Sequence, residues 1–114
     1  MSLVRKIART YFEYSNQSDM AQIGTLLTHN CTYYSRQLGF FVGQRKVIEM
    51  QTVFHAQYQL LSWEILSLKE LKLNVIEIEF SFEGVLQNGE QQTRQGREHI
   101  LTYDGLIQHI AVGL

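Results

Sequence analysis

The chain has 114 residues, of which 45% are apolar and 18% are charged, enough for one domain with a hydrophobic core and too few for two. Ten basic and eleven acidic side chains give a net charge of -1, which excludes the strongly basic surface of a typical binder of nucleic acids or anionic membranes. The single cysteine, Cys31, excludes an intramolecular disulfide scaffold. We therefore expect one cytoplasmic domain spanning residues 1–114, with no nucleic-acid or membrane partner.

Apolar residues at three-and-four spacing predict a first helix from about Leu3 to Asn16. Ser18 is expected to cap a second helix, which carries an aspartate in its first turn and ends near His29 and Asn30. The β-branched and aromatic segment 31–36 predicts a short strand. The first third of the chain thus reads as helix, helix, strand.

A glycine-punctuated loop holding Phe40 and Phe41 is expected next, followed by a third helix that begins after Gly43 and includes Tyr58. From Leu60 onward the apolar pattern has a period of two, which predicts strands. The order helix, helix, strand, helix and four strands indicates an α+β domain. We expect a cone-shaped, curved sheet, antiparallel or mixed, with the three helices packed on its concave face.

The segment 76–82 has the clearest alternation, with apolar residues at the even positions and polar residues between them. Asn88-Gly89 and Asp104-Gly105 are both strong signals for two-residue hairpin turns. Two-residue turns would pair Ile78 with His99 and His99 with Ile110, which places His99 on the apolar face. A bulge at Gly84 or Gly96 would shift this register. The predicted apolar face collects Ile76, Ile78, Phe80, Phe82, Arg97, His99, Leu101, Tyr103, Gln108, Ile110 and Val112, and the opposite face Glu77, Glu79, Glu98, Ile100, Thr102, Ile107, His109 and Ala111.

Four features of the sequence resemble a known superfamily. In residues 11–19 a helix breaks before an aspartate, and residues 28–35 lead into the first strand. Gly43 precedes the third helix, and residues 101–107 form the last hairpin turn with its flanking residues. Their order and spacing resemble the nuclear transport factor 2-like superfamily, which includes SnoaL-like polyketide cyclases and ketosteroid isomerases. The resemblance covers nearly the whole chain. It implies a cone-shaped apolar pocket between helices and sheet, and it does not fix the function.

In the isomerase branch the resemblance implies three polar groups in the pocket. It places the helix-one tyrosine on Tyr11, the carboxylate base of the first strand on Ser35 and the protonated acid of the next-to-last strand on His99. Because Ser35 cannot accept a carbon-bound proton unaided, the usual base is missing. Our candidate catalytic residues are therefore His99, as a neutral base, and Tyr11, as the donor to an oxyanion. The alternative makes His99 a satisfied core histidine and Tyr11 a core side chain.

The candidate ligand-binding residues lie on the predicted apolar face or beside it. Arg97 could neutralise an anionic ligand or extend to the pocket mouth, and core packing is the alternative for Trp63. His99 and His109 are predicted on opposite faces, so no metal site is expected, and no phosphate-binding glycine motif or other cofactor signal occurs. The candidates are Ser35, Trp63, Ile78, Phe80, Arg97, Leu101, Ile110 and Val112.

Two functions follow as hypotheses. The first is binding of a small, mostly apolar ligand with a carbonyl or hydroxyl group, with acid–base isomerase or cyclase chemistry on an enolisable substrate if the protein is an enzyme. The second is a non-catalytic binding or association domain whose cavity is filled by its own side chains. Ile100, Ile107 and Ala111 interrupt the charges of the outer face, and with the resemblance they predict a homodimer through that face. The sequence names neither the ligand nor the pathway, and cavity volume separates the two hypotheses.

Overall fold

The computed structural model describes residues 2–113. Within this range no helix is both long enough and apolar enough to cross a membrane. The elements, in chain order, are α1 (Leu3–Asn16), α2 (Met20–Leu26), β1 (Leu27–Ser35), β2 (Gly39–Val42), α3 (Gln44–Ala56), β3 (Tyr58–Lys72), β4 (Val75–Leu86), β5 (Gln91–Tyr103) and β6 (Leu106–Val112).

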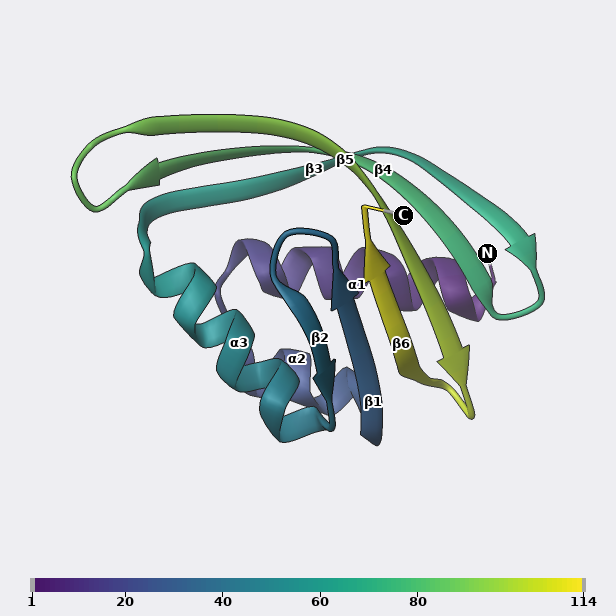
Figure 1. Cartoon of the computed structure of the whole chain (residues 1–114). Coiled ribbons are helices and arrows are strands. Elements are labelled where there is room, and N and C mark those ends of the chain that lie inside the picture. The colour runs from purple at the N-terminus through teal and green to yellow at the C-terminus, as the bar shows by residue number, and fades with distance from the viewer. Residues whose placement is uncertain (1, 114) are drawn as a thin grey trace.

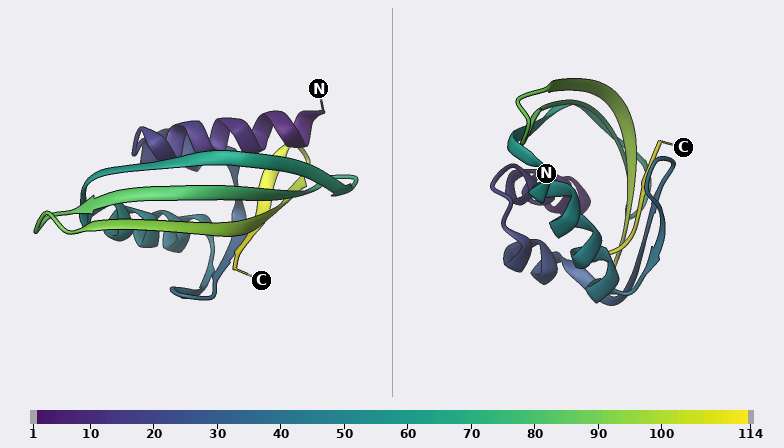
Figure 2. Two further views of the ribbon diagram at one scale, coloured as in Figure 1. Left: turned by 90° about the horizontal axis from the view of Figure 1, so that it is seen from above. Right: turned by 60° about the vertical axis from the view of Figure 1, so that its left-hand side comes forward.

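The strands form one six-stranded sheet in the order β2-β1-β6-β5-β4-β3. β1 and β6 are parallel and all other neighbours are antiparallel, so the sheet is mixed. The sheet is strongly curved, and the long strands β3, β4 and β5 arch over the helices (Figure 1). Viewed from the side, the sheet wraps around the three helices on its concave face (Figure 2). The predicted α+β class and curved mixed sheet are confirmed.

Helix α1 lies on the concave side, where it packs on β3 and β4, and it matches its predicted bounds. The Ser2 side chain caps it by accepting a hydrogen bond from the backbone N–H of Arg5. Its apolar stripe is buried against the sheet and includes Val4, Ile7, Ala8, Tyr11 and Phe12. Tyr11 is thereby carried into the interior of the cone.

The second helix and the segment after it differ from the prediction. Asp19, not Ser18, caps α2 by accepting a hydrogen bond from the N–H of Gln22. The helix ends at Leu26, because Leu27 already pairs with Ile107 of β6 and extends β1 toward its N-terminus. The predicted strand was therefore too short.

The segment predicted as a loop around Phe40 and Phe41 is the short edge strand β2, antiparallel to β1. Tyr58 was predicted on the third helix but begins β3, since α3 ends at Ala56. The sheet thus has six strands where five were predicted.

The predicted pairing of β4 with β5 is wrong by one residue. The backbone N–H of Leu86 donates to the carbonyl of Glu90, which leaves three residues, Gln87 to Gly89, in the turn. Gly89 has a φ of 89°, the left-handed conformation that closes a three-residue hairpin loop. Since a slip of one residue moves every side chain to the other face, β5 is inverted relative to the prediction.

The second hairpin has the predicted two-residue turn, because Tyr103 pairs with Leu106. The register then shifts between Leu101 and Thr102, where β6 carries an extra residue in a bulge. This bulge allows Ile107 and Ile110, three residues apart, both to be fully buried.

The extra residue in the β4–β5 turn exchanges the faces of β5, and the bulge brings Ile110 of β6 to the same side as Ile100. Glu98, Ile100 and Thr102 are buried on the concave side, whereas Leu101 is 39% exposed. Ile100 and Ile107 belong to the core, so their predicted place in an outer-face dimer patch is wrong. On β4 the predicted faces are confirmed: Ile76, Ile78, Phe80 and Phe82 are all buried.

Candidate functional site

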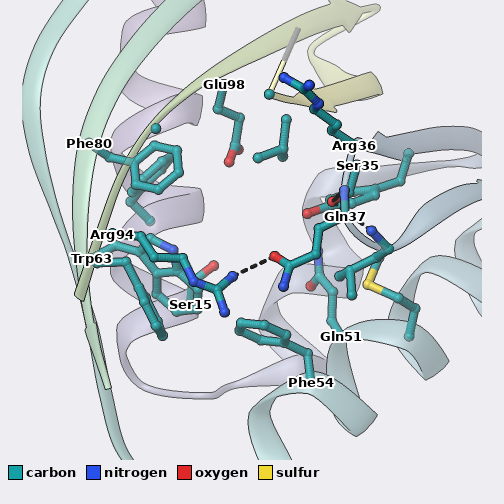
Figure 3. A pocket seen from close by; sticks show the side chains of 18 of the residues that line it. Ser15, Ser35, Arg36, Gln37, Gln51, Phe54, Trp63, Phe80, Arg94 and Glu98 are labelled. Atoms are coloured by element: carbon teal, nitrogen blue, oxygen red, sulfur yellow. Dashed lines mark hydrogen bonds between the residues drawn. The ribbon is translucent and has the colours of Figure 1, made fainter. Parts of the chain in front are cut away.

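A cavity of about 230 Å³ lies between helices α1 and α3 and the concave face of the sheet. Its walls are mostly apolar and aromatic, as in pockets that take small organic ligands. An apolar cavity of roughly 150 Å³ holds benzene, so this cavity has room for a somewhat larger ligand. Figure 3 shows the few polar side chains that reach it.

Glu98 of β5 points its carboxyl group into this cavity (Figure 3). The residue is 6% exposed, and within residues 2–113 neither carboxyl oxygen has a hydrogen-bond partner, with Oε2 fully buried. Burial away from water raises the pKa of Glu98 to about 8, because the charged form loses its solvation. Glu98 is therefore mainly a neutral carboxylic acid at pH 7, with a proton to donate to a ligand.

Besides the Glu98 carboxyl group, the cavity is lined by Tyr11 of α1, which carries a phenol hydroxyl. Gln51 of α3 donates a hydrogen bond from Nε2 to the Tyr11 hydroxyl oxygen over 2.7 Å, which leaves the Tyr11 proton free for another acceptor. The Oε1 atom of Gln51 is buried and has no hydrogen-bond partner among residues 2–113. Burial, followed by the nearby Glu98, raises the pKa of Tyr11 well above its ordinary value, so the phenol stays protonated.

His55, near the end of α3, also lines the cavity. Its Nδ1 lies 2.8 Å from the hydroxyl oxygen of Ser18, and its ring lies 5.4 Å from the ring of Trp63. Burial lowers the pKa of His55 below its ordinary 6.5, which keeps the imidazole neutral at pH 7. A neutral imidazole and a neutral carboxylic acid thus line one cavity.

The exposed residues that line the cavity come from the β1–β2 turn and from β5, which places its mouth between these two segments. The Ser35 hydroxyl accepts hydrogen bonds from the backbone N–H groups of Gln37 and Leu38, which fixes this turn. Across the opening, Nη1 of Arg94 donates to Oε1 of Gln37 (Figure 3). Arg36 also lines the cavity from the turn. The mouth is therefore polar and basic while the interior is apolar and neutral.

One wall depends on a glycine. A Cβ atom placed at Gly96 of β5 would lie 2.7 Å from the Phe80 ring, closer than side chains tolerate. The absence of a side chain at Gly96 therefore lets the Phe80 ring lie against the neighbouring strand. Both residues line the cavity.

The structure brings together part of the predicted site. Tyr11, Ser35, Trp63, Phe80 and Val112 line the cavity, as the sequence predicts. Ile78 and Ile110 are core residues that do not reach it.

Three predicted residues lie outside the cone, because the register slip turns them to the convex face. Nε2 of His99 lies 3.0 Å from Oε2 of Glu77, and the residues paired with His99 are Glu77 and Ala111, so the predicted isoleucine-flanked environment of His99 is wrong. Arg97 pairs with Glu77 and Glu79, and Leu101 is partly exposed. The prediction that His99 faces Tyr11 is therefore wrong as well.

Sequence reasoning missed Glu98, Gln51, His55 and Arg94. The signal for Glu98 was available, since Ile100 and Ile107 sat among charged residues on the face predicted to be wet. Reading these isoleucines as core would have inverted β5 and brought Glu98 inside. No such signal marks Gln51, an ordinary residue on a helix.

Within residues 2–113, no group of three or more histidine, cysteine, aspartate or glutamate side chains is placed to hold a metal ion. The polar groups of the cavity are hydroxyl, amide, imidazole, carboxylic acid and guanidinium, and most of them are hydrogen-bond donors. The arrangement suits an organic ligand with oxygen acceptors.

Comparisons with known proteins find likeness at the level of structure. No family model matches the sequence. No curated protein matches it either. Many solved structures do match.

Three of these structures illustrate the likeness. A hypothetical protein from Catenulispora acidiphila with a ketosteroid isomerase-like fold, solved with trimethylamine, superposes with a TM-score of 0.86 at 14% identity, over 95% of this chain and 84% of that one. An NTF2-like protein of unknown function from Burkholderia pseudomallei gives a TM-score of 0.86 at 15% identity, over 100% and 92%. An LEH-like epoxide hydrolase of M. tuberculosis gives 0.85 at 9% identity, over 97% and 81%.

At these identities the likeness establishes the architecture and leaves the chemistry to the site. The curved mixed sheet, the three helices inside it and the cavity between them agree with the resemblance drawn from the sequence. The chain has the nuclear transport factor 2-like fold, shared with ketosteroid isomerase-like proteins.

Proposed function

We propose that this protein binds a small, mostly apolar ligand in the cone, with a carbonyl or hydroxyl oxygen of the ligand seated against Glu98. The observation that carries this proposal is the buried Glu98 carboxyl, whose Oε2 has no hydrogen-bond partner within residues 2–113. A buried polar group normally has a hydrogen-bond partner, and leaving one unpaired costs about 1–3 kcal/mol. A ligand oxygen would accept the Glu98 proton, and Tyr11 offers a second donor.

The same groups support acid–base catalysis on an enolisable substrate. A carboxylic acid kept neutral by an apolar site can donate a hydrogen bond to an oxyanion that develops on the substrate. His55 takes over the role of base that was predicted for His99, since it is a neutral imidazole on the cavity wall at pH 7. Activity would then be greatest above the lowered pKa of His55 and below the pKa of Glu98, about 8.

The competing hypothesis was a cone filled by its own side chains. The cavity of about 230 Å³ beside Tyr11 and Glu98 favours ligand binding over that alternative. Among structures of this fold, one is described as an epoxide hydrolase and another as having a ketosteroid isomerase-like fold, which agrees with a ligand-binding cone.

The test compares ligand-induced thermal stabilisation across variants, with a panel of aromatic and terpenoid ketones and native mass spectrometry as a second readout. Glu98→Leu removes the donor, and we expect it to weaken binding about tenfold, the value of a typical net hydrogen bond. Glu98→Gln keeps an N–H donor and should retain part of the affinity. His99→Gln, one residue along β5 on the opposite face, is the matched control and should bind like the wild type.

Unchanged ligand-induced shifts in Glu98→Leu would contradict the proposal. Because the shift is measured against each variant's own unliganded melting temperature, a change in basal stability does not disturb the comparison.

We also propose that the protein forms a homodimer through the convex face of the sheet. The strand register aligns Phe40 with Tyr34, Ala111 and His99 across four strands of this face. Phe40 is 60% exposed and Val42, on the same edge strand, is 59% exposed. These side chains replace the predicted Ile100 and Ile107 as support for the interface.

A further inference from the structure

The charged side chains around the cavity are not balanced. Apart from the tyrosines, the titratable side chains that line it are Arg36, Arg94, His55 and Glu98. His55 and Glu98 are shifted toward their neutral forms by burial, whereas the two arginines keep their charge. Among residues 2–113, the side-chain charge that lines the cavity at pH 7 is therefore positive, and it comes from the two arginines.

Arg94 in particular has no anionic partner among residues 2–113. Its guanidinium donates to two neutral amide oxygens, Oε1 of Gln37 and, over 3.1 Å, Oε1 of Gln92. Among residues 2–113, no carboxylate lies within 4.0 Å of the guanidinium groups of Arg94 or Arg36.

Arg97 shows the contrast on the same strand. It faces the convex side and lies 3.4 Å from a carboxyl oxygen of Glu79 and 4.0 Å from one of Glu77. Three residues earlier, Arg94 faces the concave side, opposite Phe82 of β4. Within the described part of the chain, Arg97 outside the cavity therefore has carboxylate partners, whereas Arg94 at the mouth donates only to amide oxygens.

We propose that the mouth is a subsite for a carboxylate on the ligand, held by Arg94 with help from Gln37 and Arg36. The inference rests on the proposed function and narrows it to a ligand class: an apolar body with an oxygen acceptor at the Glu98 end and a carboxylate at the Arg94 end. The planar guanidinium presents two parallel N–H donors that match a carboxylate better than they match an amide oxygen.

The present contacts of Arg94 would allow a ligand carboxylate to replace one of its amide partners. Its hydrogen bond to Gln37 links β5 to the β1–β2 turn across the front of the cavity (Figure 3). An incoming carboxylate would replace the Gln37 oxygen, and rotation of the Gln37 amide would turn its N–H groups toward the same anion. Ser35 holds the turn that carries both Gln37 and Arg36, so these donors are already positioned.

The experiment uses three probes on the full chain: acetophenone, 4-acetylbenzamide and 4-acetylbenzoate. The last two have the same shape and differ in charge. We expect the wild type to bind the benzoate about tenfold more tightly than the benzamide, by titration calorimetry at low salt. Arg94→Gln should abolish this preference. Arg97→Gln removes the same charge from the opposite face of β5 and should preserve it.

The outcomes separate this inference from the proposed function. Equal affinities of the wild type for benzoate and benzamide, or an undiminished preference in Arg94→Gln, would overturn the carboxylate subsite. Acetophenone binding that is weakened by Glu98→Leu and unaffected by Arg94→Gln would still support the proposed function. Failure of all three probes to bind the wild type would overturn both.

Discussion

Glu98 and Glu77 are carboxyl groups on neighbouring strands, and they face opposite sides of the same sheet. On the convex side Glu77 accepts a hydrogen bond from His99 at 3.0 Å and lies 4.0 Å from Arg97. On the concave side Glu98 has no partner within residues 2–113, and burial raises its pKa to about 8. The surroundings therefore turn one carboxyl group into part of a surface network and the other into a proton donor facing a cavity.

The strongest test of this difference between Glu98 and Glu77 concerns the register of β4 and β5, which decides which residues of β5 face the concave side. Ile100 is fully buried and its neighbour Leu101 is 39% exposed. We expect Ile100→Ala to lower the free energy of unfolding by about 4 kcal/mol, since it leaves a cavity in the core, and Leu101→Ala by less than about 1 kcal/mol. Urea denaturation of the two variants measures this. A reversed order would restore the register predicted from two-residue turns.

A second prediction concerns the pH dependence of stability. The carboxyl group of Glu98 ionises near pH 4.5 in the unfolded chain and near pH 8 in the folded one, so between these values the native state holds the extra proton. Below about pH 4.5 the carboxyl group is protonated in both states and does not lower the free energy of unfolding. As the pH rises from there toward 8, the free energy of unfolding falls by about 1.4 kcal/mol per pH unit. Glu98→Gln should lack this loss and exceed the wild type by about 3 kcal/mol at pH 7.

The measurement is the difference in unfolding free energy between Glu98→Gln and the wild type from pH 4.5 to 9. His55, Tyr11 and Tyr33 line the cavity in both proteins, so their own titration largely cancels in the difference. A difference that does not change with pH would show that Glu98 is ionised in the folded protein and would contradict its role as a donor.

The smallest expected change in stability is on the convex face. Phe40→Glu replaces an exposed side chain of β2 and should change the free energy of unfolding by less than about 0.5 kcal/mol. It should nevertheless convert the proposed dimer into a monomer, as measured by light scattering after size exclusion. Leu73→Glu, at the exposed turn after β3, is the control and should leave the dimer intact. A wild-type monomer would remove the dimer proposal.

Local patterns predicted much of the fold because they depend on few residues. The apolar spacing of α1 and the alternation of β4 each bury one face, and both were read correctly. The edge strand β2 was missed because its four residues are mostly exposed and flanked by turns, so burial leaves no pattern in it.

The candidate site was harder to predict, because its key residue depends on the length of one turn. Asn88-Gly89 suits both a two-residue turn and the last two positions of a three-residue turn. The even and the odd positions of β5 both contain an apolar residue, Ile100 and Leu101 respectively, so the sequence of this strand does not by itself indicate which set is buried. The bulge in β6 then lets Ile107 and Ile110 face the same side of the sheet, although an odd spacing in a regular strand would put them on opposite sides. Tyr11 was identified because the resemblance pointed to a helix-one tyrosine and the apolar spacing of α1 placed it inside, whereas the choice between Glu98 and His99 depended on the length of the β4–β5 turn.

The contact of Gly96 with the Phe80 ring has a consequence for how this fold could diversify. A methyl group at position 96 would force the aromatic ring to move, and with it one wall of the chamber, while the Tyr11–Gln51 hydrogen bond on the two helices would stay in place. Substitution at this single position of β5 could therefore change the size of ligand that the cavity accepts, without altering the Tyr11 and Gln51 side chains that offer hydrogen bonds to it.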